Sequence, residues 1–463
     1  MSPQLFDSGL GSDAPTPKQI VAELDKYIVG QEKAKRAVAI AIRNHYRRRE
    51  LHPSFQEEVT PKNILMIGPT GVGKTEIARR IARFISAPFI KVEVTKFTEV
   101  GYVGRDVDSM VRELVEAAIN MVRAEEREKI EEAARRRAED KLLDILAPLP
   151  KVQRTPFLGE QEDATLETAK RYRRERRQEI RDHSIDDTEI DVEVYEPTVR
   201  VMDFSAMPGM EEMGTQIQQM LEGNIPKKKK KRKMKIAEAH RAFLEQEFEN
   251  LLDREKITQE GLRRAQQNGI VFLDEMDKIA APAGGHGHGP DVSREGVQRD
   301  LLPVVEGTSV STKYGPVKTD HILFIGAGAF HMSKPSDLIP ELQGRFPVRV
   351  ELESLTTDDF KRILIEPENA LTKQYQELLR VDGVNLKFTQ DGIEELATTA
   401  FKVNEGTQDI GARRLHTVVE RCLEDVAFRA PDPDLREVVV DRKFVKATLK
   451  DILASEDLQK YIL

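Results

Sequence analysis

The sequence Gly-Pro-Thr-Gly-Val-Gly-Lys-Thr at residues 68–75 decides the fold class of this chain. An apolar run at 64–67 precedes it, and a helix-compatible stretch follows it. This order of strand, glycine-rich loop and helix predicts a P-loop, whose backbone N–H groups surround a phosphate at a helix N-terminus. Lys74 would reach the β- and γ-phosphate oxygens, and the Thr75 hydroxyl would bind Mg²⁺. The pattern therefore predicts a site for a nucleoside triphosphate, and a glycine-rich turn without a ligand is the weaker interpretation.

Further apolar runs indicate a parallel sheet. Together with the first run they lie at 64–67, 89–94, 270–273, 322–325 and 348–352. Because they are continuously apolar rather than alternating, they suit strands buried on both faces. A helix is predicted to begin after Thr16, since Pro17 and Gln19 complete a capping pattern. Beyond about residue 353, helices with short strands at 384–388 and 438–440 indicate a separate, smaller α+β unit.

The composition changes abruptly between the second and third predicted strands. Residues 123–140 carry 13 charged side chains out of 18 with almost no apolar face, which predicts a helix projecting into solvent. We interpret 113–259 as an insertion. The basic run 227–233 could be a nucleic-acid patch or a localisation signal. A solvated linker between helices is favoured, because its neighbours are acidic and no aromatic residues interleave with it.

Composition limits the classes of protein that fit. The 463 residues suffice for two or three domains, and a net charge of −8 argues against a protein that coats nucleic acid. Cys422 is the only cysteine, which excludes an intramolecular disulfide framework and predicts a reducing environment. No run of about 18 apolar residues is present, so we expect a soluble, intracellular protein. The Gly/His-rich segment 284–289 is interpreted as a mobile loop rather than a metal site.

Two acidic residues follow the apolar run at 270–273. Asp274 at a strand end would lie near the nucleotide Mg²⁺, and Glu275 could polarise an attacking water. A surface acidic pair is the alternative. Phosphoryl transfer also needs positive charge against the developing negative charge. Arg345 and Arg413 stand in suggestive contexts, although spacing alone does not select them from 72 basic residues.

The P-loop, the strand-end Asp-Glu, Glu-Leu-Gln-Gly-Arg at 341–345 and Gly-Ala-Arg-Arg-Leu at 411–415 resemble, in this order, an AAA+ ATPase. Gly-Tyr-Val-Gly at 101–104, the charged insertion, the segment 293–303 and the terminal Tyr-Ile-Leu resemble more narrowly the HslU family, also called ClpY. The resemblance runs from about residue 17 to 463. It implies an α/β AAA+ P-loop ATPase with a parallel sheet, a largely helical inserted domain and a small α+β C-terminal domain.

The resemblance also implies domain bounds and an activity. Residues 1–16 would be a flexible leader, 17–112 with 260–352 the large ATPase domain, 113–259 the inserted domain and 353–463 the small domain. The family consists of hexameric, ATP-driven unfoldases and translocases that feed substrate proteins to a dodecameric HslV-type peptidase. A homohexamer, ATP with Mg²⁺, unfolded or tagged protein substrates and a cytoplasmic, stress-related role are implied. No peptidase nucleophile, nucleic-acid partner or membrane partner is expected.

Particular residues take roles from this resemblance. Val29 would line the adenine site, Glu341 would contact the nucleotide or its interface, Arg345 would act across the subunit boundary, and Arg413 would sense the γ-phosphate. The phosphates and Mg²⁺ would be held by Gly71, Val72, Gly73, Lys74, Thr75 and Glu76, with Asp274 as a further metal ligand and Glu275 as the base. AAA+ proteins often place a polar side chain at the end of the fourth strand, and residues 324–328, including Ala327, offer none.

Two short segments would engage proteins. Gly101 and Gly104 would make a mobile loop, on which Tyr102 and Val103 present an apolar grip for an extended chain. A buried tyrosine in a turn is the plainer alternative. At the C-terminus, the apolar residues Tyr461, Ile462 and Leu463 would dock on the peptidase, or else pack on their own domain.

Three rival functions stay open from the sequence. The first is a ClpX-like unfoldase that serves another peptidase. The single cysteine argues against it, because the zinc module of such an unfoldase needs several cysteines. A DNA-remodelling AAA+ motor would need a basic DNA-binding domain, and only the run 227–233 is strongly basic. A nucleotide-binding scaffold without hydrolysis is disfavoured by Glu275.

Overall fold

A computed structural model of the chain describes residues 14–59, 62–98, 105–149, 159–196, 228–280, 294–406, 409–432 and 434–453. The chain forms two compact units. Unit 1 comprises Met1–Met121 with Thr258–Leu463, and unit 2 comprises Val122–Ile257. In the described residues, no helix combines the length and the apolarity needed to cross a bilayer.

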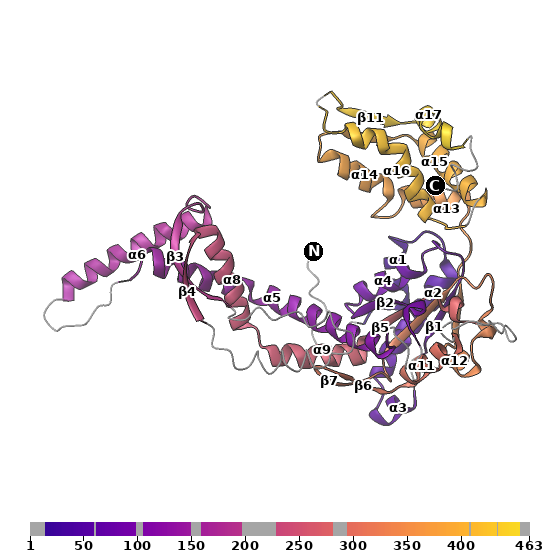
Figure 1. Cartoon of the computed structure of the whole chain (residues 1–463), viewed down its shortest axis with the longest axis horizontal. Helices are drawn as coiled ribbons and strands as arrows, with labels where there is room; N and C mark the ends of the chain where they lie inside the picture. Colours follow the sequence, from indigo (N-terminus) through magenta and orange to yellow (C-terminus); the bar gives the residue numbers. More distant parts are fainter. Residues whose placement is uncertain are drawn as a thin grey trace. The chain divides into compact units, whose positions relative to one another are not determined.

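A five-stranded parallel sheet organises the first part of unit 1 (Figure 1). Its spatial order is β2 (Phe89–Glu93), β5 (Ile270–Asp274), β8 (Leu323–Gly328), β1 (Ile64–Ile67) and β9 (Val348–Glu351). All four neighbouring pairs are parallel, so the carboxyl ends of the strands meet at one edge. The five strands predicted from apolar runs are confirmed, with ends that differ by at most three residues.

Helices pack on one face of this sheet. Apolar side chains of α1 (Pro17–Asp25), α2 (Glu32–Arg49) and α4 (Lys74–Phe84) join Ile64, Met66 and Phe272 in one buried core. The predicted capping at the start of α1 is confirmed: Thr16 and Gln19 form a reciprocal capping box, with Pro17 at the first helical position. This core fixes the strand–loop–helix unit around residues 68–75.

Shorter elements complete the first part of unit 1. They are α3 (Pro53–Glu58), η1 (Val94–Lys96), α10 (Met276–Ile279), α11 (Arg294–Glu306), η3 (Pro335–Asp337), α12 (Pro340–Arg345) and the antiparallel pair β6 (Ser309–Thr312) and β7 (Gly315–Lys318).

The C-terminal part of unit 1 has its own hydrophobic core. It contains α13 (Thr357–Ile365), α14 (Leu371–Arg380), α15 (Gln390–Gly406), α16 (Arg413–Arg429) and α17 (Arg442–Leu453). Two short strands, β10 (Asn385–Phe388) and β11 (Glu437–Val440), pair in parallel against these helices. The small α+β arrangement expected after residue 353 is present. Leu355, in the connection from β9, packs against both cores.

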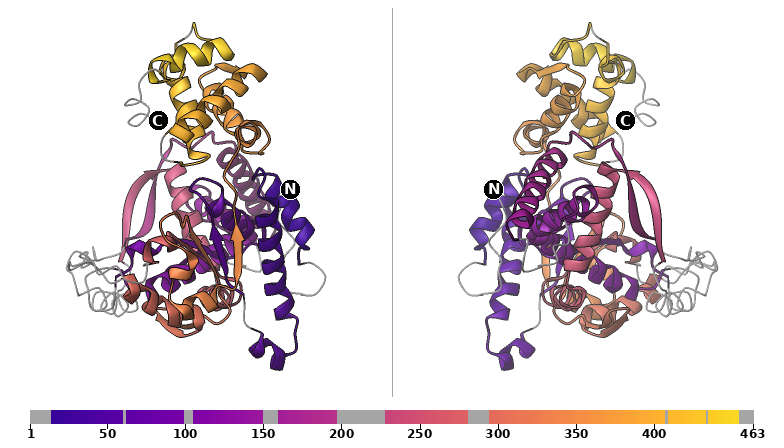
Figure 2. Two further views of the ribbon diagram at one scale, coloured as in Figure 1. Left: turned by 90° about the vertical axis from the view of Figure 1, so that its right-hand side faces the viewer. Right: turned by 90° about the vertical axis from the view of Figure 1, so that its left-hand side faces the viewer.

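Unit 2 is built from helices and one antiparallel hairpin. The long helix α5 (Asp108–Leu146) enters it and α9 (Arg254–Asn268) leaves it, with α6 (Gly159–Arg181) and α8 (Ile236–Leu251) between. The hairpin pairs β3 (Glu189–Glu196) with β4 (Lys228–Lys235), and both views of Figure 2 show these strands side by side. Ile190, Val192 and Met234 face a small core with α5, α6 and α8.

The hairpin corrects the interpretation of the basic run. Apart from Lys227, which lies outside the described residues, the run 227–233 is not a linker between helices but most of strand β4. The register sets Asp191 opposite Lys233 and Glu189 opposite Lys235. Opposite charges directly across an antiparallel pair stabilise it, so a basic strand is accommodated by an acidic partner 32 or more residues earlier in the chain. The sequence signal was the alternation Glu-Ile-Asp-Val-Glu-Val at 189–194.

Candidate functional site

The loop between β1 and α4 has the backbone geometry of a phosphate-binding loop. Gly68, Gly71 and Gly73 have φ values of 152°, 74° and 102°, in the region that side chains disfavour. Helix α4 begins at Lys74 without a side-chain cap on its first turn. The first N–H groups of a helix lack intrahelical acceptors and carry the positive end of the helix dipole. This end of α4 is therefore suited to an anion.

The Lys74 side chain is buried inside the loop, with 8% of the residue exposed. Its Nζ donates hydrogen bonds of 2.5 Å to the carbonyl oxygens of Gly68 and Pro69. Burial lowers the pKa of Lys74 to about 8, the carboxylates of Asp274 and Asp277 oppose that shift, and the charge of Arg413 adds to it. Three charged groups from separate elements thus act on Lys74 in the P-loop.

The two acidic residues at the end of β5 are held by one residue of the neighbouring strand β2 and one of η1, which follows it. Lys91 forms an ion pair of 2.7 Å with Asp274, and the Thr95 hydroxyl donates a hydrogen bond of 2.7 Å to Glu275. Glu275 has a positive φ of 61°, a conformation that costs free energy for a side chain other than glycine. The turn directs its carboxylate toward η1. Neither Lys91 nor Thr95 was singled out in the sequence.

Asp277, on α10, is hydrogen-bonded to the chain that follows β8. Its Oδ1 accepts a hydrogen bond of 3.1 Å from the Ala329 N–H, and its carbonyl accepts one of 3.0 Å from the Ser333 hydroxyl. Ala327 itself is fully buried within β8. Residues 324–328 offer no polar side chain, but Asp277 on α10 brings one to the chain that follows β8. Its sequence signal is a third acidic residue, two positions after Glu275.

The segment before α16 lies against the P-loop. The Thr70 hydroxyl donates a hydrogen bond of 2.9 Å to the Asp409 carbonyl, and the Ala412 N–H donates one of 3.1 Å to the Gly71 carbonyl. Arg413, the first residue of α16, is exposed directly after this contact. The structure thus brings Arg413 to the P-loop, as its proposed role requires.

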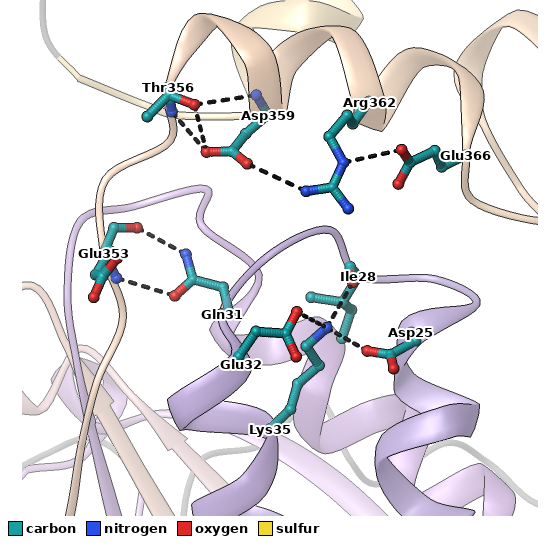
Figure 3. A network of polar contacts seen from close by, with 10 residues as sticks. All are labelled: Asp25, Ile28, Gln31, Glu32, Lys35, Glu353, Thr356, Asp359, Arg362 and Glu366. Atoms are coloured by element: carbon teal, nitrogen blue, oxygen red, sulfur yellow. Dashed lines mark hydrogen bonds and ion pairs between the residues drawn. The ribbon is translucent and has the colours of Figure 1, made fainter.

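Val29 lies in the turn between α1 and α2 and is 6% exposed. The turn is held from within by Lys35, whose Nζ donates to the Ile28 carbonyl at 3.3 Å and pairs with Glu32 and Asp25 (Figure 3). It is also held from the connection between β9 and α13 by two hydrogen bonds. In these the Gln31 side-chain amide donates to the Glu353 carbonyl at 2.8 Å and accepts from the Glu353 N–H at 3.0 Å.

Arg345 and Glu341 lie on α12. The Arg345 guanidinium pairs with Glu306 at 2.9 Å, and its carbonyl accepts a hydrogen bond from Asn63 at 3.0 Å. Both Glu341 and Arg345 are exposed. Over the described part of the chain, no contact joins either side chain to the P-loop.

Two predicted segments lie outside the described residues: the glycine-flanked loop 101–104 and the terminal residues 461–463. The Gly/His-rich segment 284–289 is also outside them. The chain on either side of the first loop is described, since Phe97 and Arg105 form a parallel bridge and the Thr98 N–H donates to the Arg105 carbonyl at 3.3 Å. Among the residues that are described, no three His, Cys, Asp or Glu side chains gather into a metal site.

A P-loop after β1 with a buried lysine in it, and two carboxylates at the end of β5, define a P-loop ATPase on a parallel α/β sheet. Two family models agree with this class. Residues 64–181 match the ATPase family associated with various cellular activities (AAA), and residues 196–349 match the AAA domain (Cdc48 subfamily).

Relatives match nearly the whole chain. A protein of Persephonella marina named "ATP-dependent protease ATPase subunit HslU" is 56% identical over 448 residues, which cover 97% of this chain and 98% of that protein. Proteins of the same name from Thermotoga maritima and Thermoanaerobacter sp. are 55% and 54% identical, over 97% of this chain and 99% of each relative. The chain belongs to the HslU family of AAA ATPases. The resemblance stated from its motifs is confirmed, and with it the AAA+ fold, nucleotide binding and ATP hydrolysis.

Proposed function

We propose that this chain is an ATP-driven protein unfoldase and translocase, which assembles into a homohexameric ring and activates an HslV-type peptidase. The observation that carries the proposal is the match, along nearly the full length, to relatives named as ATPase subunits of an ATP-dependent protease. The P-loop with Asp274 and Glu275 beside it supports ATP as the energy source. The chain would be the motor of the complex and not its peptidase.

At the ATPase site, the N–H groups of residues 71–75 would bind the phosphates, and Lys74 would turn from the loop carbonyls to the β- and γ-phosphate oxygens. The Thr75 hydroxyl and the Asp274 carboxylate would hold Mg²⁺, which usually keeps phosphate and water ligands as well. That ion neutralises the charge developing on the transferred phosphoryl group. Glu275 would orient and deprotonate the attacking water.

The remaining roles involve neighbouring elements and subunits. Val29 would lie against the adenine base, and Glu76 would complete the phosphate site. Arg413 would contact the γ-phosphate from the C-terminal part of unit 1. Glu341 and Arg345 would serve the site of the adjacent subunit. The exposure of both residues on α12 supports this, because a residue acting in a partner's site must be accessible in the single chain.

Several parts of this account stay predictions. They are the bounds of the inserted domain (113–259) and of the small domain (353–463), a grip by Tyr102 and Val103, docking by residues 461–463, and a cytoplasmic, stress-related role. Similarity to HslU proteins favours an HslV-type partner over the peptidase of a ClpX-like enzyme. A DNA motor is disfavoured further, because most of the basic run forms a strand opposite an acidic one. DNA should not stimulate ATP turnover, whereas the peptidase should.

Degradation of a stably folded, tagged protein tests the proposal. The full chain, an HslV-type peptidase and ATP should degrade it together, and omission of ATP should stop degradation. Tyr102→Ala should abolish degradation while ATP hydrolysis continues, because the substitution removes the aromatic grip and leaves the sequence of the P-loop and of Asp274 and Glu275 unchanged. Degradation at the normal rate by Tyr102→Ala would assign that residue a structural role.

A further inference from the structure

The backbone of residues 409–412 packs on the backbone of the P-loop more closely than side chains would permit. A Cβ atom on Gly71 would collide with the Ile410 carbonyl, and one on Gly411 would lie 2.7 Å from the Thr70 carbonyl oxygen. Both glycines have positive φ, 74° and 58°. With the hydrogen bonds from Thr70 and Ala412, this makes a continuous backbone contact between the two segments.

Asn404 organises this segment from the last turns of α15. The residue is 8% exposed, and its side chain both donates and accepts hydrogen bonds within this segment. Its Nδ2 donates to Asp409 Oδ1 at 2.6 Å, and its Oδ1 accepts from the N–H groups of Ile410 at 3.0 Å and Gly411 at 3.1 Å. Asp409 Oδ1 also accepts from the Gly411 N–H at 3.0 Å. One amide thus fixes both ends of the Asp409–Gly411 turn.

The helix that carries Asn404 is anchored in the second core. Leu396, Ala397, Ala400 and Val403 on α15 are buried there. The turn is consequently held on one side by a rigid helix and on the other by the P-loop, and α16 begins with Arg413 immediately after it. A displacement of either partner must move the start of α16.

We propose that Asn404 is a positioning residue of the ATPase site, which holds the Asp409–Ala412 segment on the P-loop and thereby sets how well the site distinguishes a nucleoside triphosphate from a diphosphate. Asn404 acts through Arg413, and this inference rests on the γ-phosphate contact proposed for Arg413. A guanidinium reaches a particular phosphate only if its backbone is fixed, since its hydrogen bonds are directional. Asn404 supplies that fixation without touching the nucleotide.

The test is the ratio of ATP to ADP affinity, measured in the full chain carrying Glu275→Gln to limit turnover. In Asn404→Asp, a carboxylate faces Asp409 in place of the amide donor. We expect ATP binding to weaken about tenfold relative to ADP binding, in keeping with the loss of buried hydrogen bonds. The exposed Asn385→Asp on β10 makes the same chemical change away from the site and should leave the ratio unaltered.

The exchanged pair Asn404→Asp with Asp409→Asn restores one carboxylate and one amide, so the ATP/ADP ratio should recover. Failure of the exchange to recover it would overturn the inference. Thr70→Val removes the hydroxyl that donates to the Asp409 carbonyl, whereas Thr70→Ser keeps a hydroxyl there. Thr70→Val should therefore lower the ATP/ADP affinity ratio relative to Thr70→Ser, and this comparison remains possible even if Asn404→Asp does not fold. An unchanged ratio in Thr70→Val would also contradict the inference.

Arg413→Ala separates this inference from the proposed function. If Arg413→Ala leaves the ratio unchanged, the γ-phosphate role of Arg413 is wrong, and the positioning role falls with it. If Arg413→Ala lowers the ratio while Asn404→Asp does not, only the positioning role is overturned. A parallel loss in both, recovered by the exchanged pair, supports the two together.

Discussion

The Thr95 hydroxyl donates a hydrogen bond of 2.7 Å to the Glu275 carboxylate. Thr95 follows β2 and Glu275 follows β5, and these strands pair in parallel with Glu93 opposite Asp274. The hydroxyl therefore fixes the carboxylate from η1, the turn that follows the neighbouring strand β2. An amide at position 275 could still accept this bond, which makes glutamine a nearly isosteric probe of the charge alone.

Glu275→Gln should bind ATP and assemble normally while turnover falls by roughly 10² or more, because a positioned base contributes about that factor. Steady-state phosphate release and nucleotide affinity measure the two effects separately. The matched control is Glu351→Gln, an exposed residue at the end of β9. Turnover close to normal in Glu275→Gln would remove this residue from the chemical step.

Lys74 should make ATP binding depend on pH. Because its pKa in the folded chain is about 8, below the usual 10.5, the unfolded chain holds a proton that the folded chain has lost between these pH values. The contribution of this group to stability therefore rises as pH increases through that window. Phosphates close to the ammonium should raise its pKa again, so ATP binding near pH 9 should take up a large fraction of a proton.

Calorimetry at pH 9 in buffers of different ionisation enthalpy measures this uptake. The terminal phosphate of ATP is itself fully ionised there, since its pKa is about 6. Lys74→Arg keeps a charge that does not titrate in this range, and any binding it retains should show no proton uptake. Equal, near-zero uptake in both proteins would mean that Lys74 is already protonated without the nucleotide.

The hairpin of unit 2 should depend on its cross-strand charges. Asp191→Lys places two lysines opposite each other at the exposed pair Asp191–Lys233, and should destabilise the hairpin by about 0.5–1 kcal/mol. The exchange Asp191→Lys with Lys233→Asp should restore it. Hydrogen exchange of the strand amides measures both effects. If 1 M salt leaves the difference between the variants intact, the effect is not electrostatic.

The parts of the site that depend on local pattern could be predicted from the sequence. Residues 68–75 and 270–275 each combine an apolar strand with its functional side chains in one continuous stretch, so the P-loop and its neighbouring carboxylates follow directly. The contact of Asp409–Ala412 with the P-loop could not be predicted in this way, because it joins residues more than 330 positions apart. For the same reason Asn404 resembled any polar residue near a helix end.

The basic run shows a related limit. Seven consecutive basic residues have low strand propensity and indicate a solvated segment when considered alone. Their strand becomes favourable only with the acidic strand 189–196 in register beside it. Strand pairing over such a separation is a tertiary property, and the alternation in the acidic partner was its one visible sign.

The most direct test of the central claim is the rate at which an HslV-type peptidase cleaves a small fluorogenic peptide, with and without this protein and ATP. We predict strong stimulation by the full chain with ATP. A variant lacking residues 457–463 should lose that stimulation while hydrolysing ATP and forming rings as before, because the apolar terminal residues would supply the docking contact. A peptidase rate unaffected by the full chain would contradict the proposed function, and normal stimulation by the truncated chain would contradict docking through its C-terminus.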